Sequence, residues 1–310
     1  MRILITGGLG FIGSHLVNML GDKHDIDIVD GFSQDYEGYK YIHRGNKGLD
    51  ECNEIEKKHR ELNLKYRLSL INNKYTSYYR YHAFIKLPLQ QYDLVINCGA
   101  LSEAILSQHF PEFTKESIID SLKCLKKFYP STPFLHISSS MVYGTWEGLI
   151  NEQYSLGSEN LYGLSKIKAE TLCGEKDIIL RPIHVYGMGD GKFSIWMNIE
   201  RQVAINKSVL VEEAACIYID DFVSTVKNIV DKWIPGTYNI AYDFVRTENA
   251  LKKVYPKEFE TQLKLGPTGK PRGKLNSDKL LNTFGVNFEY SNYEGTVRDY
   301  YGKYENFCKK

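Results

Sequence analysis

The sequence has no paired cysteines, no long apolar run and almost no net charge, and each absence excludes a class of protein. Six cysteines are spread over 310 residues without a C-x-x-C pair, which argues against a zinc site or a disulfide scaffold and favours a reducing cytoplasm. No run reaches the roughly 18 apolar residues of a membrane span. With 39 basic and 38 acidic side chains, the net charge of +1 offers no bulk attraction to nucleic acid or membrane. We therefore expect a cytoplasmic protein with no metal site, no membrane contact, no nucleic-acid partner and no signal peptide before its first strand.

A glycine-rich turn near the N-terminus is the most informative stretch that is present. The apolar residues 1–5 predict a strand, residues 14–20 predict a helix, and three glycines lie between them. Glycines let the backbone turn tightly, approach a diphosphate and pack the helix onto the sheet. The first N–H groups of the helix then point at the phosphates. The expected cofactor contacts in this turn are Gly7, Gly10, Phe11, Ile12 and Gly13.

A second apolar strand, residues 26–29, ends in Asp30. A carboxylate at that position can bind both hydroxyls of an adenosine ribose. A glycine turn without a ligand is the plain alternative, but the strand, the helix and Asp30 together favour a dinucleotide site. Because Asp30 would repel a 2′-phosphate and residues 31–33 supply no arginine, we expect NAD rather than NADP.

Strand and helix patterns alternate through the first two thirds of the chain. Apolar strands are predicted at residues 92–100, 134–138 and 177–181, with helices at 116–128 and 161–173. This alternation predicts an α/β fold, a Rossmann-type doubly wound parallel sheet with a smaller C-terminal substrate-binding part. We assign residues 1–181 to the cofactor domain and 182–310 mostly to substrate binding, with segments near 217–241 returning to the sheet.

An insert of unclear structure separates the second strand from the strand at residues 92–100. It carries a charged segment at 50–58, expected to be a solvated helix or loop, and a tyrosine-rich segment at 75–81 that could be a strand.

Tyr162 and Lys166 are the second strong signal, because residues four apart share one face of a helix. A free tyrosine has a pKa near ~10, whereas a base that works at neutral pH needs a value near ~7. A neighbouring ammonium and a bound nicotinamide cation both favour the phenolate. Ser139, at the end of the strand before this helix, could hydrogen-bond the same substrate hydroxyl. The same spacing is common by chance, but the upstream glycine turn and Ser139 favour a catalytic role.

With these motifs, the chain resembles the extended short-chain dehydrogenase/reductase family of sugar-nucleotide epimerases and dehydratases. The likeness covers residues 6–16, 97–101, 136–144, 162–170, 180–187, 217–223 and 238–241. It implies that Tyr162 is the base, that Lys166 holds the nicotinamide ribose, and that Ser139 orients the hydroxyl. It also implies cofactor contacts at Cys98, Gly99, Ala100, Tyr162, Lys166 and Pro182. The substrate contacts that it implies are Ser102, Ser140, His184 and Arg272.

Two departures from the family pattern bear on the reaction and the substrate. Where 4,6-dehydratases carry Thr-Asp-Glu, this chain has Ser139-Ser140-Met141, which supplies no acid or base for removing water. The loop before Asp220 lacks the family's phosphate-binding arginine and carries Glu212 and Glu213 instead. Arg272 lies where relatives place another such arginine; a solvated basic loop is the equal alternative.

The leading hypothesis is an NAD-dependent epimerase of a nucleotide sugar. In it, Tyr162 assists hydride transfer to bound NAD through a transient keto-sugar. The first alternative is a net oxidoreductase of the same family, a keto-sugar reductase or alcohol dehydrogenase, for which a non-nucleotide substrate stays open. The second is a cofactor-binding scaffold without catalysis, against which Ser139, Tyr162 and Lys166 argue. The oligomeric state stays open, with a homodimer as the form common in the family.

Overall fold

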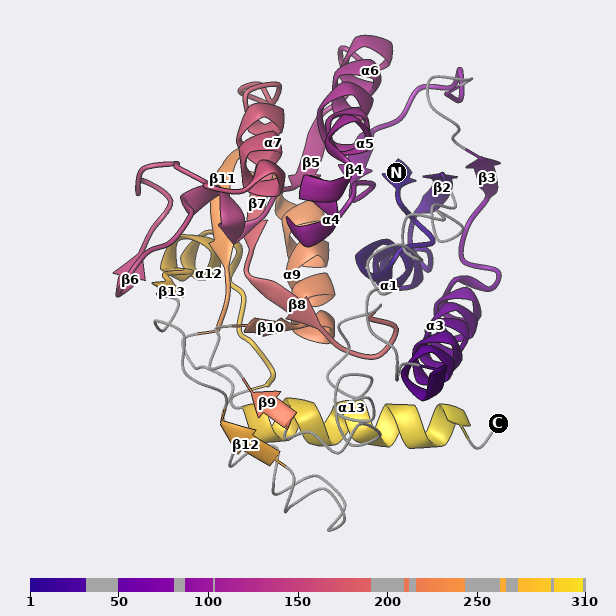
Figure 1. Cartoon of the computed structure of the whole chain (residues 1–310). Helices are drawn as coiled ribbons and strands as arrows, with labels where there is room; N and C mark the ends of the chain where they lie inside the picture. The colour runs from indigo at the N-terminus through magenta and orange to yellow at the C-terminus, as the bar shows by residue number, and fades with distance from the viewer. Residues whose placement is uncertain are drawn as a thin grey trace.

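The computed structural model describes residues 1–31, 50–80, 87–102, 104–190, 209–211, 216–242, 263–265, 273–290 and 293–308. Within these ranges a seven-stranded sheet has the order β11-β7-β5-β4-β1-β2-β3, and every neighbouring pair is parallel (Figure 1). This confirms the predicted Rossmann-type doubly wound sheet. Its strands are β1 (Arg2–Thr6), β2 (Asp25–Asp30), β3 (Ser77–Arg80), β4 (Leu94–Asn97), β5 (Phe134–Ile137), β7 (Ile178–Pro182) and β11 (Gly236–Ile240).

Helices cover both faces of this sheet because alternate strand residues point to opposite sides. Ile3 and Ile5 of β1 pack with α1 and α9 in one buried cluster, whereas Leu4 packs with η2, α6 and α7 in another. The helices in the described ranges are α1 (Phe11–Leu20), α3 (Asp50–Ile71), α4 (Ala104–His109), α5 (Pro111–Lys115), the π-helix η2 (Glu116–Asp120), α6 (Ser121–Phe128), the 3₁₀ helix η3 (Ser140–Tyr143), α7 (Leu161–Glu170), α9 (Ile219–Lys232), α12 (Asp278–Phe284) and α13 (Tyr293–Cys308).

In the described residues of the insert that the sequence left unclear, the structure has one long helix and one strand. The helix, α3, has Ile71 buried in the cluster that contains α1, with Leu62, Tyr66 and Leu70 packed against it. The tyrosine-rich segment forms β3, which pairs with β2 at the edge of the sheet and confirms the predicted strand. The insert therefore extends the core beside α1.

Where it is described, the C-terminal part adds short parallel strand pairs and the helices α9, α12 and α13. The pairs join β6 (Leu149–Ile150) to β13 (Lys274–Leu275), β8 (His184–Tyr186) to β10 (Cys216–Tyr218), and β9 (Val209–Val211) to β12 (Leu263–Leu265). Side chains cap the outer edge of β11: Ser277 Oγ accepts from Ala241 N, and Lys279 Nζ donates to the Thr237 carbonyl. Capping of this kind satisfies backbone groups that would otherwise be open to pairing with another chain.

Candidate functional site

The carboxyl ends of β1, β2 and β4 lie side by side and carry the predicted cofactor turn. Thr6 at the end of β1 is in register with Val29 of β2 and Asn97 of β4. Gly7 has φ +67°, and a β-carbon on it would lie 2.7 Å from Gly99 Cα. A β-carbon on Gly13 would lie 2.1 Å from the Gly7 carbonyl oxygen. Glycine is therefore required where the two turns and α1 meet, and the backbone stays open to a phosphate.

A buried polar network fixes the turn after β4 against β1. The Thr6 hydroxyl donates to Asn97 Oδ1 at 2.7 Å and accepts from Gly99 N at 3.1 Å. Asn97 Nδ2 lies 3.0 Å from His136 Nδ1 of β5, and burial lowers the pKa of His136 well below its ordinary value. A neutral His136 keeps this network free of charge beneath the turn of Cys98, Gly99 and Ala100.

Asp30 is held at the end of β2 by the glycine turn itself. The Leu9 N–H donates to Asp30 Oδ2 at 2.9 Å. This bond fixes the carboxylate beside the mouth of the turn, where an adenosine ribose is bound in sites of this kind. The close-packed glycines, the open N-terminus of α1 and Asp30 together fit a dinucleotide cofactor.

We expect NADP to bind at least about tenfold more weakly than NAD, because Asp30 places a negative charge where a 2′-phosphate would lie. Calorimetric titration of both cofactors measures the difference. Asp30→Asn is the matched variant, since its amide oxygen can still accept the Leu9 N–H while the charge is lost. This variant should reduce the difference in affinity between NAD and NADP. Equal binding of NAD and NADP by the unaltered protein would contradict the expectation.

Tyr162, Lys166 and Ser139 lie together across β5, η3 and α7. Asn160 caps α7 by accepting from Gly163 N at 2.8 Å, which starts the helix just before Tyr162. Ser139 lies close enough to Tyr162 to lower the pKa of its hydroxyl. Lys166 Nζ donates to the Ile137 carbonyl at 2.9 Å and lies 5.8 Å from the centre of the Tyr162 ring. The two helical residues therefore share one buried face next to the end of β5.

Burial opposes the charged forms of both helical residues. It raises the pKa of Tyr162 to about 12, and the nearby Ser139 side chain opposes this shift. It lowers the pKa of Lys166 to about 8, and Cys98 and Glu170 oppose that shift. A tyrosine with this pKa is almost entirely protonated at neutral pH, so a positive charge beside it is needed to populate the phenolate.

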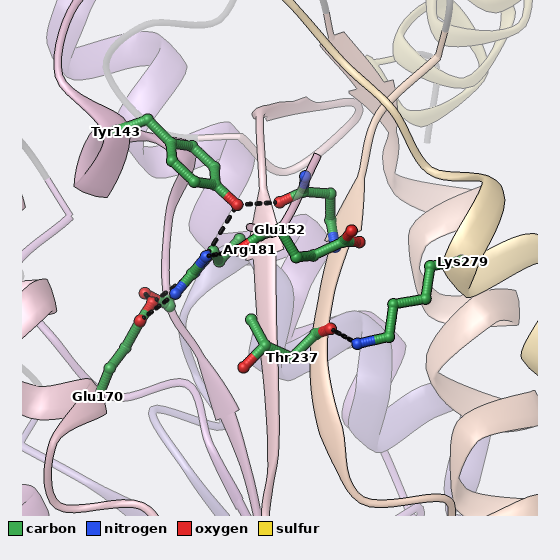
Figure 2. Close-up of polar contacts among 8 residues, drawn as sticks. Tyr143, Glu152, Glu170, Arg181, Thr237 and Lys279 are labelled. Atoms are coloured by element: carbon green, nitrogen blue, oxygen red, sulfur yellow. Dashed lines mark hydrogen bonds and ion pairs between the residues drawn. The ribbon is translucent and has the colours of Figure 1, made fainter. Parts of the chain in front are cut away.

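A buried ion-pair network next to α7 was not predicted from the sequence. Arg181 of β7 donates from Nε and Nη2 to the two carboxylate oxygens of Glu170, at 3.0 and 2.6 Å (Figure 2). Its Nη1 donates to the Tyr143 hydroxyl at 2.8 Å, and Tyr143 donates to Asn239 of β11 at 2.7 Å. Ser138, next to Ser139, also donates to Glu170. The one sequence signal was the position of Glu170, four residues after Lys166 on the same face.

The other predicted residues are only partly brought together. Cys98 lies close enough to Lys166 for each to act on the other's pKa, and Ala100 packs in the cluster that contains Tyr162. Pro182 ends β7 directly after Arg181. Ser140 is buried in η3, His184 is half-buried in β8 with its ring stacked on Tyr186, and Ser102 is exposed. Arg272, Glu212 and Glu213 lie outside the described residues.

Among the described residues, no group of three or more His, Cys, Asp or Glu side chains is placed to hold a metal ion. In the same part of the chain, no helix has both the length and the apolar character needed to cross a membrane.

The family model described as "NAD dependent epimerase/dehydratase family" matches residues 3–241. The match runs from β1 to the end of β11 and so includes the glycine turn, Asp30, Ser139, Tyr162 and Lys166. The chain belongs to this family. The match confirms the resemblance drawn from the motifs and NAD as the cofactor of the family.

Two curated relatives are similar at the sequence level. A dTDP-D-glucose 4,6-dehydratase of Dictyostelium discoideum is 28% identical over 288 residues, which cover 82% of this chain and 61% of that protein. An uncharacterized UDP-glucose epimerase of Bacillus subtilis is 27% identical over 203 residues, which cover 60% of this chain and 57% of that protein. The matched regions thus span about three fifths of each relative's length.

A solved structure shares the whole fold. UDP-glucuronic acid 4-epimerase from Bacillus cereus, in complex with UDP-glucuronic acid and NAD, superposes with a TM-score of 0.78 at 19% identity, covering 99% of both chains. At this identity the likeness concerns the fold.

Proposed function

We propose that the protein is an NAD-dependent epimerase that inverts one hydroxyl-bearing carbon of a nucleotide sugar. The family restricts the chemistry to epimerisation, dehydration and related steps. The residues that follow Ser139 support the choice among them. The relatives named as UDP-sugar epimerases support the substrate class.

The observation that best supports this proposal is the kind of side chain that lies near Tyr162. Met141 packs against the same cluster as Tyr162, and Ser140 is buried within η3. Removing water from a sugar needs an acid and a base of its own, and neither a thioether nor a serine hydroxyl supplies them. Epimerisation needs only one such group, because the proton taken from the hydroxyl is later returned to the same oxygen. Tyr162 alone can carry out both transfers.

The chain's own residues then have separate tasks. Bound NAD supplies a reversible hydride acceptor. Tyr162 removes the proton of the ring hydroxyl and gives a proton back to the keto-sugar oxygen after the ring has turned. Ser139, close to Tyr162, orients that oxygen. Lys166, anchored on the Ile137 carbonyl, holds the nicotinamide ribose and favours the phenolate. Ser102, His184 and Arg272 are proposed for the sugar nucleotide.

Incubation with single UDP- and dTDP-sugars in D₂O tests the proposal, with products read by NMR and cofactor by absorbance. We expect a 4-epimer without deuterium at carbon, because the hydride returns from the cofactor, and without net change of cofactor. Deuterium at C5 with loss of water would indicate dehydration instead. A stoichiometric change of cofactor would indicate the net oxidoreductase, and no product from any sugar nucleotide would contradict the proposed substrate class.

A further inference from the structure

The insert helix α3 packs against α1 and α13 (Figure 1). His59 stacks on Tyr304 of α13 with ring centres 5.7 Å apart, and Tyr66 meets Phe307 edge to face at 5.3 Å. Asn63 donates from Nδ2 to the Asp190 carbonyl. These contacts fix α3 against the loop that follows β8, residues 187–190. Arg67 is a further buried polar residue of α3, one turn after Asn63.

Arg67 is a buried cation with a guanidinium N–H group that has no acceptor among the described residues. It is 4% exposed, its Nη1 donates to the Gly189 carbonyl at 3.1 Å, and its Nε has no hydrogen-bond partner within the part of the chain that the structure describes. Burial lowers the pKa of Arg67, and the nearby charges of Asp190 and Asp30 oppose that shift. A guanidinium stays protonated in proteins, so a buried one requires anions and acceptors around it.

Its neighbours place Arg67 next to the start of α1. A β-carbon on Gly189 would lie 3.3 Å from Arg67 Cγ and 3.4 Å from His15 Cε1. His15 Nδ1 lies 2.8 Å from the Phe11 carbonyl oxygen, one turn from the helix N-terminus. That N-terminus is where the cofactor diphosphate is bound in a turn of this kind. Arg67 therefore lies at the side of the phosphate position, close enough to Asp30 for the Asp30 charge to act on its pKa.

The local charge balance calls for a cation there. Asp30 and Asp190 are both close enough to Arg67 to act on its pKa, and a diphosphate adds further negative charge beside them. The dipole of α1 contributes only about half a positive charge. We infer that Arg67, from the insert helix, is a cofactor-binding residue whose guanidinium contacts the diphosphate of NAD. The inference concerns cofactor binding and does not depend on which sugar the enzyme converts.

Calorimetry on the full chain, freed of nucleotide, tests the role with a graded set of ligands. Arg67→Met keeps most of the buried volume and removes the charge, and Arg67→Lys keeps the charge. We expect Arg67→Met to weaken NAD and ADP-ribose by about tenfold to hundredfold. Arg67→Lys should recover part of that loss. Adenosine, which lacks phosphate, should bind the unaltered protein and both variants alike by saturation-transfer NMR.

Asn63→Ala is the matched control, because it removes a contact between α3 and the same loop without changing charge. NAD binding in Asn63→Ala should stay within about threefold of the unaltered protein, since the free-energy change is then under about 1 kcal/mol. An equal loss of adenosine and ADP-ribose in Arg67→Met would show a structural role and overturn the inference. Unchanged ADP-ribose binding in Arg67→Met would overturn it as well. If Arg67→Met does not fold, Arg67→Lys decides: a partial loss of NAD and ADP-ribose affinity with unchanged adenosine binding supports the charge contact, and an equal loss of adenosine binding or unchanged ADP-ribose affinity overturns it.

Discussion

Tyr162→Phe should lower the turnover of the enzyme by about a hundredfold to ten-thousandfold, the range typical for loss of a general acid–base group. The substitution removes one oxygen and keeps a ring that is 8% exposed and packed with α7 and β5 neighbours. NAD affinity should stay within about threefold, because the lost group acts on the substrate hydroxyl. Steady-state kinetics with the converted sugar nucleotide and calorimetry with NAD measure the two quantities.

A second buried tyrosine provides the matched control. Tyr129 donates to the Pro88 carbonyl at 2.6 Å, and Tyr129→Phe should lower the stability of the fold while leaving turnover nearly unchanged.

The turnover of the unaltered enzyme should also rise with pH, because the phenolate is the active form and burial raises the pKa of Tyr162 to about 12 in the cofactor-free protein. Near-normal turnover in Tyr162→Phe would remove this residue from the acid–base role.

Arg181→Met should lower the free energy of unfolding by about 3–5 kcal/mol, the cost typical of breaking a buried ion pair. Both partners are 6% exposed at their side chains, and the substitution leaves the Glu170 carboxylate without its two guanidinium donors. The Tyr143 hydroxyl loses a donor as well. Chemical denaturation of the unaltered protein and the variant, at a pH near neutrality, gives the difference.

An exposed pair and a double variant serve as controls. Lys227 and Asp231 are 32% and 47% exposed and lie 3.0 Å apart, so Lys227→Met should cost no more than about 0.5 kcal/mol. Glu170→Leu combined with Arg181→Met removes both charges and should be more stable than Arg181→Met alone. If the double variant loses as much free energy of unfolding as Glu170→Leu and Arg181→Met lose together, the two side chains are not coupled.

Short-range patterns were enough to predict the cofactor turn and the sheet. The glycines at 7, 10 and 13, Asp30 after an apolar strand, and the Tyr162–Lys166 spacing each depend on residues that are close in sequence. Parallel strands place their carboxyl ends at one edge, so the neighbourhood of Gly7 and Gly99 followed from the strand assignments alone. The family match over residues 3–241 is consistent with these motifs.

The insert and the support of the catalytic helix could not be predicted in the same way. Arg67 lies 37 positions after Asp30, on a polar helix whose pattern gives no sign of burial, and only the packing of this helix against α1 and α13 buries it. Arg181 of β7 and Glu170 of α7 come from different elements, and their pairing (Figure 2) depends on how β7 and α7 pack together. The sequence by itself determined the sheet, the cofactor class and the candidate base, because those depend on local hydrophobic period and backbone geometry. Only the tertiary structure decided which charges are buried together, because burial and pairing depend on contacts between distant segments.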